Sequence, residues 1–258
     1  MLPPLPAPLP LLGHALHPVG LDEAAAWVLA AASRDGPPRL VVTLNPEIIV
    51  RARRDEGLRQ ALARADLTVA DGVGVVWAAK RAGRPLPGRV PGVDLAFEVL
   101  ARGGTGLRVA LVGGRPGVAE RAARVATARW GVTVTTARHG YFDHRLEAEA
   151  VAAEVAAGRP QLLLAGLGEG QELLLERHLE AWGARVSIGV GGTLDVLAGS
   201  ASRTPAWTRR IGLEWAWRVG FDPARWHRIP RLLDFVRLAW RQPRPSEAPR
   251  ADERQRRP

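Results

Sequence analysis

Several polar residues stand where a short apolar run gives way to the start of a helix. They are Thr43, Asn45, Asp71, Arg89 and Asp94. In open parallel α/β sheets, ligands bind in the crevice outside the carboxyl ends of the strands. A carboxylate between an apolar strand and a glycine, as Asp71 is, stands where a general base could act. These junctions therefore form the first candidate site.

Asp71 has a structural alternative. An aspartate directly before a helix commonly caps the helix N-terminus, and the local pattern alone favours the cap over the base. Asp66, five residues earlier, is expected to cap or turn the chain.

The other junction residues also allow two interpretations. The hydroxyl of Thr43 and the amide of Asn45 can hold sugar or phosphate oxygens without adding charge, whereas Asn45 before a proline also suits a helix N-cap. Arg89 could pair with a diphosphate, and an ion pair between Arg89 and Asp94 is an equally good interpretation.

Two glycine-rich segments follow predicted strands. LVGGRPGVAE contains Gly113 and Gly114, and GVGGTLDVLAG contains Gly191, Gly192 and Asp195. Backbone N–H groups at such a helix start can bind phosphate, although a plain tight turn has the same pattern. Neither segment is the G-x-G-x-x-G of dinucleotide-binding folds, so a nicotinamide-dependent oxidoreductase lacks its fingerprint.

Strand and helix patterns alternate along most of the chain. Strands are expected over 39–43, 66–70, 107–112, 132–137, 161–165 and 185–190, and helices over 21–33, 116–130, 146–157 and 171–182. This alternation predicts an α/β fold with a doubly wound, mostly parallel, Rossmann-like sheet. The proline-broken start is read as a loose arm leading into a strand.

The composition changes near Arg203. Residues 203–240 hold eight arginines and five tryptophans, and strand signals vanish. We expect an α/β domain over 1–202, a helical C-terminal appendage over 203–240 with a last helix over 231–240, and a disordered tail over 241–258.

Three patterns in fixed order carry a resemblance: T-x-N-x-E, then A-D-x-x-x-x-D-G-x-G-V-V, then R-V-x-G-x-D-L. Together they resemble the WecG/TagA/CpsF family of bacterial glycosyltransferases, from about residue 11 to about residue 237. The resemblance implies an inverting transfer of a sugar from a UDP-sugar to an undecaprenyl-diphosphate-linked sugar in cell-surface polysaccharide synthesis. The sugar would be an N-acetylhexosamine such as N-acetylmannosamine, or a hexose.

The resemblance also implies residue roles. It moves the preference for Asp71 from cap to catalytic base, makes Thr43, Asn45 and Arg89 substrate contacts, and places the nucleotide near the second glycine segment. Gln171 matches a family glutamine that contacts substrate, although the segment before it is one residue shorter here and lacks the family's proline. Glu172 is expected only to stabilise the first turn of its helix.

No D-x-D pattern occurs, so a metal-independent reaction without cofactor is expected. Arginines would then stabilise the departing diphosphate. The pattern S-R-T-P-x-W…G-L-E-W-x-W-R…P-x-R-W-x-R resembles the family's appendage and supplies Arg203 and Arg225 as catalytic candidates and Arg218 and Arg228 as substrate-binding candidates. The alternative is a solvated basic helix face.

The composition limits the classes of partner that the protein is expected to bind. The net charge of +10, nearly all from arginine, favours phosphates, nucleic acid or an acidic membrane surface. A tryptophan–arginine face suits the interface of an anionic membrane, and burial of these tryptophans is the competing explanation. No apolar run is long enough to cross a bilayer. A cytoplasmic enzyme associated peripherally with the inner face of the cell membrane is expected, with a homo-oligomer left open. The alternative is a nucleic-acid-binding module that uses the Arg/Trp-rich region.

Overall fold

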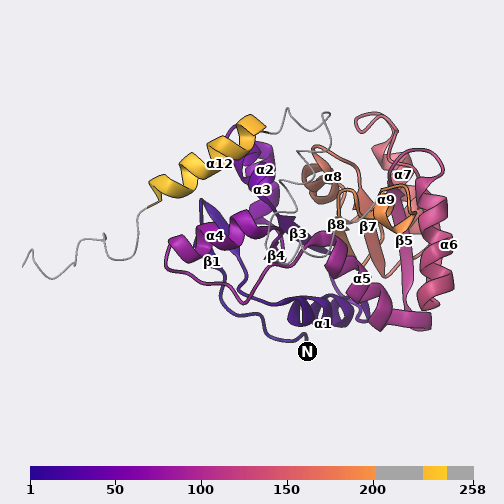
Figure 1. Ribbon diagram of the computed structural model, residues 1–258. Helices are drawn as coiled ribbons and strands as arrows, with labels where there is room; N and C mark the ends of the chain where they lie inside the picture. Colours follow the sequence, from indigo (N-terminus) through magenta and orange to yellow (C-terminus); the bar gives the residue numbers. More distant parts are fainter. Residues whose placement is uncertain (202–228, 243–258) are drawn as a thin grey trace, which may run out of the picture.

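The structure, a computed structural model, describes residues 1–201 and 229–242, and its centre is a six-stranded parallel sheet (Figure 1). The strands are β3 (Arg39–Leu44), β4 (Leu67–Ala70), β5 (Arg108–Gly113), β6 (Thr133–Arg138), β7 (Leu162–Gly166) and β8 (Val186–Gly189). Their spatial order is β4-β3-β8-β7-β5-β6. The predicted doubly wound, Rossmann-like fold is confirmed.

Helices cover both faces of this sheet. One face carries α2 (Pro46–Ala52), α3 (Glu56–Ala63), α4 (Val73–Arg81), α7 (Ala148–Ala157) and α8 (Gln171–Arg177). The other carries α1 (Leu21–Ala32), α5 (Gly92–Gly103) with the short 3-10 turn η1 (Gly104–Gly106), α6 (Val118–Trp130) and α9 (Thr193–Leu197). Alternate strand residues supply the two cores: Leu163 packs toward α7 and α8, and its neighbour Leu164 packs toward the opposite layer.

The N-terminal arm is more ordered than the sequence indicated. β1 (Leu9–Leu11) and β2 (His14–Leu16) form an antiparallel hairpin. The turn is made by Leu12 and Gly13, both with positive φ (52° and 87°). Leu11 and Leu16 are completely buried, and their burial fixes a segment that the prolines suggested would be loose.

One predicted helix is shorter than expected. The helix predicted over 171–182 ends at Arg177, and the following residues form turns. The Trp182 N–H still donates to the carbonyl of His178 (3.0 Å), which preserves a helix-like spacing while Trp182 becomes completely buried. A periodic pattern does not distinguish such turns from a continuing helix.

The last predicted helix is confirmed as α12 (Ile229–Arg241). It packs on α2 and buries Phe235 and Ala239 in the core of the α/β domain. Arg81 of α4 donates to the carbonyls of Ala239 (3.2 Å) and Trp240 (3.0 Å). The remainder of the expected appendage and the expected tail, residues 202–228 and 243–258, lie outside the described residues. In the parts that are described, no helix combines the length and apolarity needed to cross a membrane.

Candidate active site

A cleft of about 1090 Å³ opens at the carboxyl ends of the strands. Segments that follow β3, β5, β6, β7 and β8 wall it. From β5 the chain runs to α6 on one face of the sheet, and from the neighbouring β7 it runs to α8 on the other face. The cleft therefore lies at a topological switch point, where α/β proteins of this type bind ligands.

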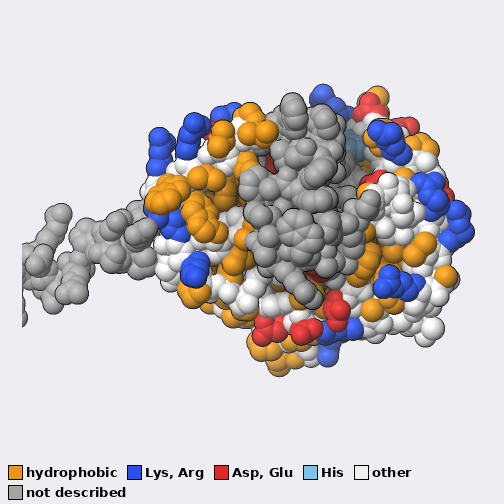
Figure 2. Space-filling model, in the orientation of Figure 1, with side chains coloured by type: hydrophobic (Ala, Val, Ile, Leu, Met, Phe, Trp, Pro, Cys, Tyr) orange, Lys and Arg blue, Asp and Glu red, His pale blue; other side chains and the backbone are white. Residues whose placement is uncertain are grey.

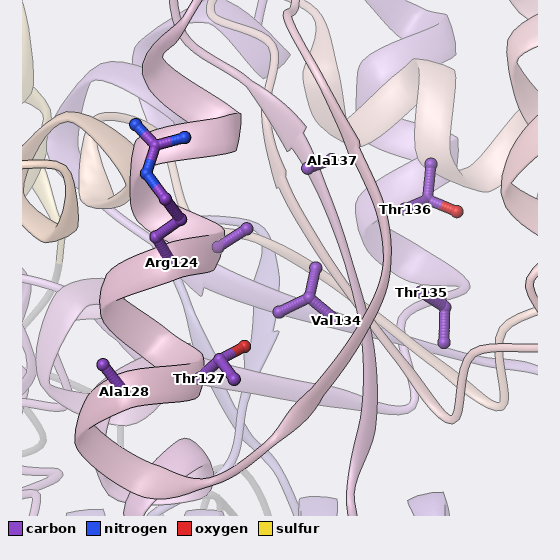
Figure 3. A pocket seen from close by; sticks show the side chains of 8 residues that line it. Arg124, Thr127, Ala128, Val134, Thr135, Thr136 and Ala137 are labelled. Carbon is purple, nitrogen blue, oxygen red and sulfur yellow. The ribbon is translucent and has the colours of Figure 1, made fainter.

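A smaller hollow of about 470 Å³ lies elsewhere, along the side of β6. Figure 3 shows Arg124, Thr127 and Ala128 of α6 beside the β6 residues, with Arg124 the one charged side chain among those labelled. This hollow runs beside the edge strand and has no carboxylate among its lining residues. The larger cleft is thus the site that can do acid–base or phosphate chemistry.

Glycines bring the strand ends together at the base of the cleft. A Cβ atom on Gly113 would lie 2.5 Å from the Gly166 carbonyl oxygen, so only glycine permits this approach. The Gly114 N–H donates to the carbonyl of Gly166 (3.2 Å), and the Gly140 N–H donates to that of Gly114 (2.9 Å). Gly113 is therefore a close-packing residue beneath the cleft, and Gly114 is part of the cleft wall.

The two glycine-rich segments meet in this cleft, as a shared phosphate site requires. Gly114, Gly191, Gly192 and Asp195 all line it. Two arginines without a predicted role, Arg115 and Arg121, line it as well, and Arg121 Nη2 donates to Ser200 Oγ (2.8 Å). Backbone N–H groups beside guanidinium groups are suited to a diphosphate.

Thr43 and Asn45 are both held at the end of β3. The Thr43 hydroxyl donates to the carbonyl of Gly189 (3.1 Å) and is buried beneath Gly92, where a Cβ would lie 3.1 Å from Thr43 Oγ1. Asn45 caps α2 by accepting the Ile48 N–H (3.0 Å) through Oδ1, and it also lines the cleft. The cap predicted as the alternative is present, and it leaves the Asn45 Nδ2 group unused by the cap.

Asp71 is not the N-cap of the helix that follows it. Gly72, with φ +99°, occupies that position before α4 and, as a glycine, makes no side-chain cap. The Asp71 N–H donates to the carbonyl of Leu44 (2.8 Å), which places the residue beside the end of β3. The N-cap position weighed as the structural alternative for Asp71 is therefore held by Gly72.

The segment that carries Arg89 returns to the same corner of the sheet. The Val90 N–H donates to the carbonyl of Ala70 (2.7 Å), so Arg89 and Asp71 flank the end of β4. Asp94 lies in the first turn of α5, which begins at Gly92 against Thr43. Of these strand-end residues only Asn45 lines the cleft, and Thr43, Asp71, Arg89 and Asp94 lie outside its lining.

Gln171 and Glu172 form a buried polar pair in the cleft wall. Gln171 Oε1 accepts the Leu167 N–H (3.3 Å), and its Nε2 donates to Glu172 Oε1 (2.9 Å). Gly189 leaves room for this amide, because a Cβ there would lie 2.9 Å from Gln171 Nε2. Only 3% of Glu172 is exposed, and burial raises the pKa of its carboxyl above the ordinary 4.5. Glu172 thus does more than stabilise a helix turn, which is all the sequence indicated.

Comparisons with known proteins agree with this geometry. Residues 9–249 match the family described as "Glycosyl transferase WecG/TagA/CpsF family". The chain belongs to this family of glycosyltransferases. It is 32% identical over 212 residues to a protein of Bacillus spizizenii, a match that covers 81% of each chain. It is 34% identical over 194 residues to a Staphylococcus aureus protein, with 74% of each chain covered. Both relatives are named N-acetylglucosaminyldiphosphoundecaprenol N-acetyl-beta-D-mannosaminyltransferase.

The appendage arginines of this glycosyltransferase cannot be placed against the cleft. Arg203, Arg218, Arg225 and Arg228 lie outside the described residues. Their predicted roles stay predictions. Among the described residues, no group of three or more His, Asp or Glu side chains is arranged to hold a metal ion.

Sequence reasoning missed a set of charged residues in the cleft of this glycosyltransferase. The cleft residues to which it gave no role include Glu47, Arg51, Arg115, Arg121 and Glu169. Arg115 and Arg121 stand in and just after the GGRPG segment, so their spacing from the glycines was a usable signal. Glu47 is the glutamate of the T-x-N-x-E pattern but was given no role, and Arg51 and Glu169 gave no signal, because they meet only when α2 and the loop after β7 fold side by side.

Proposed function

We propose that this glycosyltransferase transfers an N-acetylhexosamine, with N-acetylmannosamine as the first candidate, from a UDP-sugar to undecaprenyl-diphosphate-linked N-acetylglucosamine. The names of the two relatives support the acceptor and the sugar. The observation that supports the mechanism is the strand-end position of Asp71, whose N–H donates to the carbonyl of Leu44 at the end of β3, one residue before Asn45 of the cleft.

In the proposed reaction Asp71 acts as the general base. Its carboxylate takes the proton of the acceptor hydroxyl as that oxygen forms a bond to the anomeric carbon of the donor. The bond from the anomeric carbon to the diphosphate oxygen breaks, and UDP leaves with that electron pair. Attack from the face opposite the leaving group inverts the anomeric configuration.

The donor diphosphate is proposed to lie at the glycine-rich end of the cleft. The N–H groups around Gly114, Gly191 and Gly192 and the guanidinium groups of Arg115 and Arg121 offer hydrogen bonds and positive charge there. Asp195 in the same wall is a candidate for the nucleoside. Arg203 and Arg225 are proposed to add charge stabilisation to the departing diphosphate, so no metal is required.

The described part of the C-terminal helix suggests how the enzyme reaches a lipid-linked acceptor. α12 exposes Leu233 (52%) and Trp240 (57%), and Trp77 of α4 lies beside Trp240 with ring centroids 6.3 Å apart. Figure 2 shows hydrophobic side chains bordered by Lys and Arg in this region. We define this exposed apolar face of α12 and α4 as the apolar ridge. Aromatic and aliphatic side chains flanked by arginine suit the interface of an anionic bilayer, so the ridge is proposed to dock on the inner face of the membrane.

A donor and acceptor screen tests the proposal. Purified enzyme is given UDP-N-acetylmannosamine, UDP-N-acetylglucosamine or UDP-glucose, with or without an N-acetylglucosaminyl diphosphate that carries a short lipid chain. Released UDP and the mass of the lipid product are measured. UDP release that requires both substrates, with a disaccharide-lipid product, is expected. Acceptor-independent UDP release, or no turnover with any UDP-sugar, would refute the proposal.

A further inference from the structure

The loop between β7 and α8 forms part of the cleft wall, and its residues 168–170 include two glycines with positive φ. Gly168 and Gly170 have positive φ angles of 75° and 91°, and Glu169 stands between them. Glycines at such angles leave the unfolded and locally opened chain much conformational freedom. The loop leads directly into Gln171 and Glu172, so a shift in the loop would displace the buried pair of the cleft.

Two ion pairs hold this loop, and a third joins the two helices beside it. Arg51 Nε lies 2.9 Å from Glu169 Oε1, and Arg231 Nη2 lies 3.2 Å from the same oxygen. Arg231 Nη1 also lies 2.7 Å from Glu47 Oε1. Since α2 supplies Glu47 and Arg51 and α12 supplies Arg231, one guanidinium joins two helices and a loop. We call Glu47, Arg51, Glu169 and Arg231 the rim clamp.

The rim clamp borders the ligand cleft itself. Glu47, Arg51 and Glu169 all line the cleft. The hydrogen bond to Glu47, together with Glu169, raises the pKa of Arg231 further above its usual range, so the guanidinium stays charged. Ion pairs that form a network of four charged groups contribute more to stability than an isolated surface ion pair does.

The arginine is held in place by the packing of its helix. Phe235, one turn further along α12, is 1% exposed. A Cβ on Gly74 would lie 3.3 Å from its ring and 3.0 Å from Pro46 Cγ, so Phe235 sits where α2 begins and α4 passes. The burial of Phe235 thus holds Arg231 beside Glu47 and Glu169. The position of Arg231 therefore depends on how α12 packs on α2.

We propose that Arg231 is a positioning residue, which fixes the 168–170 loop and through it Gln171 and Glu172 for substrate binding. Its role in transfer rests on the proposed function, whereas its role in ordering the loop does not. α12 also carries the apolar ridge. The rim clamp therefore makes the conformation of the cleft wall depend on how that helix packs.

Hydrogen exchange of the loop amides tests the ordering role without any substrate. Arg231→Ala should speed exchange at residues 168–171 roughly three- to ten-fold, the range expected for losing a small ion-pair network. Arg237→Ala is the matched control, because Arg237 lies on the same helix and, among the described residues, pairs with Asp234 of that helix (3.1 Å). Equal exchange in the two variants would overturn the proposal.

A double-mutant cycle adds the functional test. Arg231→Ala and Glu169→Gln should each raise the KM for the UDP-sugar several-fold, and the double variant should be little worse than either single variant. Arg231→Lys should restore only part of the effect, since one ammonium cannot match a guanidinium that bridges two carboxylates. Strictly additive effects, or a KM unchanged in Arg231→Ala, would contradict the positioning role. If no UDP-sugar is used by any variant while loop exchange responds as expected, the proposed function fails and the clamp stands.

Discussion

At the scale of single residues, the same side chain often serves the fold and the cleft. Asn45 shows this most clearly, because its Oδ1 caps α2 while the residue lines the cleft. The Thr43 hydroxyl donates a hydrogen bond to the carbonyl of Gly189, and this bond connects β3 with β8. The types and spacing of these residues were enough to predict where they lie. The partners of their polar atoms were not predictable, because those partners are about 146 residues away in the case of Thr43.

The two tasks of Asn45 can be separated by substitution. Asn45→Ser keeps a capping oxygen but loses the amide, so we expect near-normal stability and weaker substrate binding. Asn45→Ala should lose both, with about 1 kcal/mol of stability gone. Urea denaturation and KM for the UDP-sugar measure the two effects. Asp55→Ala is the control, because Asp55 caps α3 (Oδ1 to Leu58 N, 2.9 Å) and does not line the cleft. Normal KM in Asn45→Ser would limit Asn45 to capping.

Glu172 gives a pH-dependent prediction. Because burial raises its pKa in the folded state, the free energy of unfolding should fall as the pH rises from the ordinary 4.5 toward the folded-state value. Glu172→Gln keeps an acceptor for Gln171 and removes the ionisation. The variant should match the parent in stability below the ordinary pKa of 4.5 and exceed it increasingly as the pH rises from there. Urea melts across this range measure the difference. A stability difference that does not change with pH would show that the pKa of Glu172 is the same in the folded and unfolded protein.

At the scale of elements, the sequence pattern predicted the strands that are buried in the sheet. The strands β3, β4, β7 and β8 are buried on nearly every residue and read as continuous apolar runs, which made the parallel sheet predictable. The hairpin of β1 and β2 was missed because its turn uses Leu12 at positive φ, a conformation that sequence patterns seldom mark. The last helix was predicted after Pro230, which suits a helix start, but the difference between its buried and exposed faces is evident only from its packing on α2.

The two faces of α12 predict opposite responses to mutation. Leu233→Ser, on the apolar ridge, should weaken binding to anionic liposomes by several-fold while leaving the melting temperature nearly unchanged. Phe235→Ala, two residues away and buried, should cost about 3–5 kcal/mol of stability. Liposome sedimentation and thermal melts distinguish them. Unaltered liposome binding in Leu233→Ser would remove the apolar ridge from membrane docking.

At the scale of the whole molecule, charge is distributed unevenly around the cleft. The rim clamp pairs acid with base at one rim, whereas Arg115 and Arg121 leave net positive charge beside the glycine-rich loops. Net charge alone predicted an anionic partner but could not place it. The placement follows from the sheet order, which brings the ends of β5, β7 and β8 together from distant parts of the sequence.

This charge distribution predicts a reaction that survives chelation. With arginines and backbone N–H groups to hold the diphosphate, transfer should keep its rate, within about two-fold, in excess EDTA. The assay is UDP release before and after chelation, with a known metal-dependent glycosyltransferase as the control. Loss of turnover that magnesium or manganese restores would contradict the prediction.

The base assignment is tested most directly by comparing two aspartates on one strand segment. Asp66 pairs with Arg39 (2.6 Å) at the amino end of β4, and Asp71 follows its carboxyl end. Both are changed to Asn, and single-turnover transfer is measured beside UDP binding. Asp71→Asn should slow transfer roughly 100-fold or more, with UDP binding within a few-fold of normal. Asp66→Asn should lower stability and leave the chemical step nearly unchanged. Near-normal transfer by a folded Asp71→Asn enzyme would contradict the proposed mechanism.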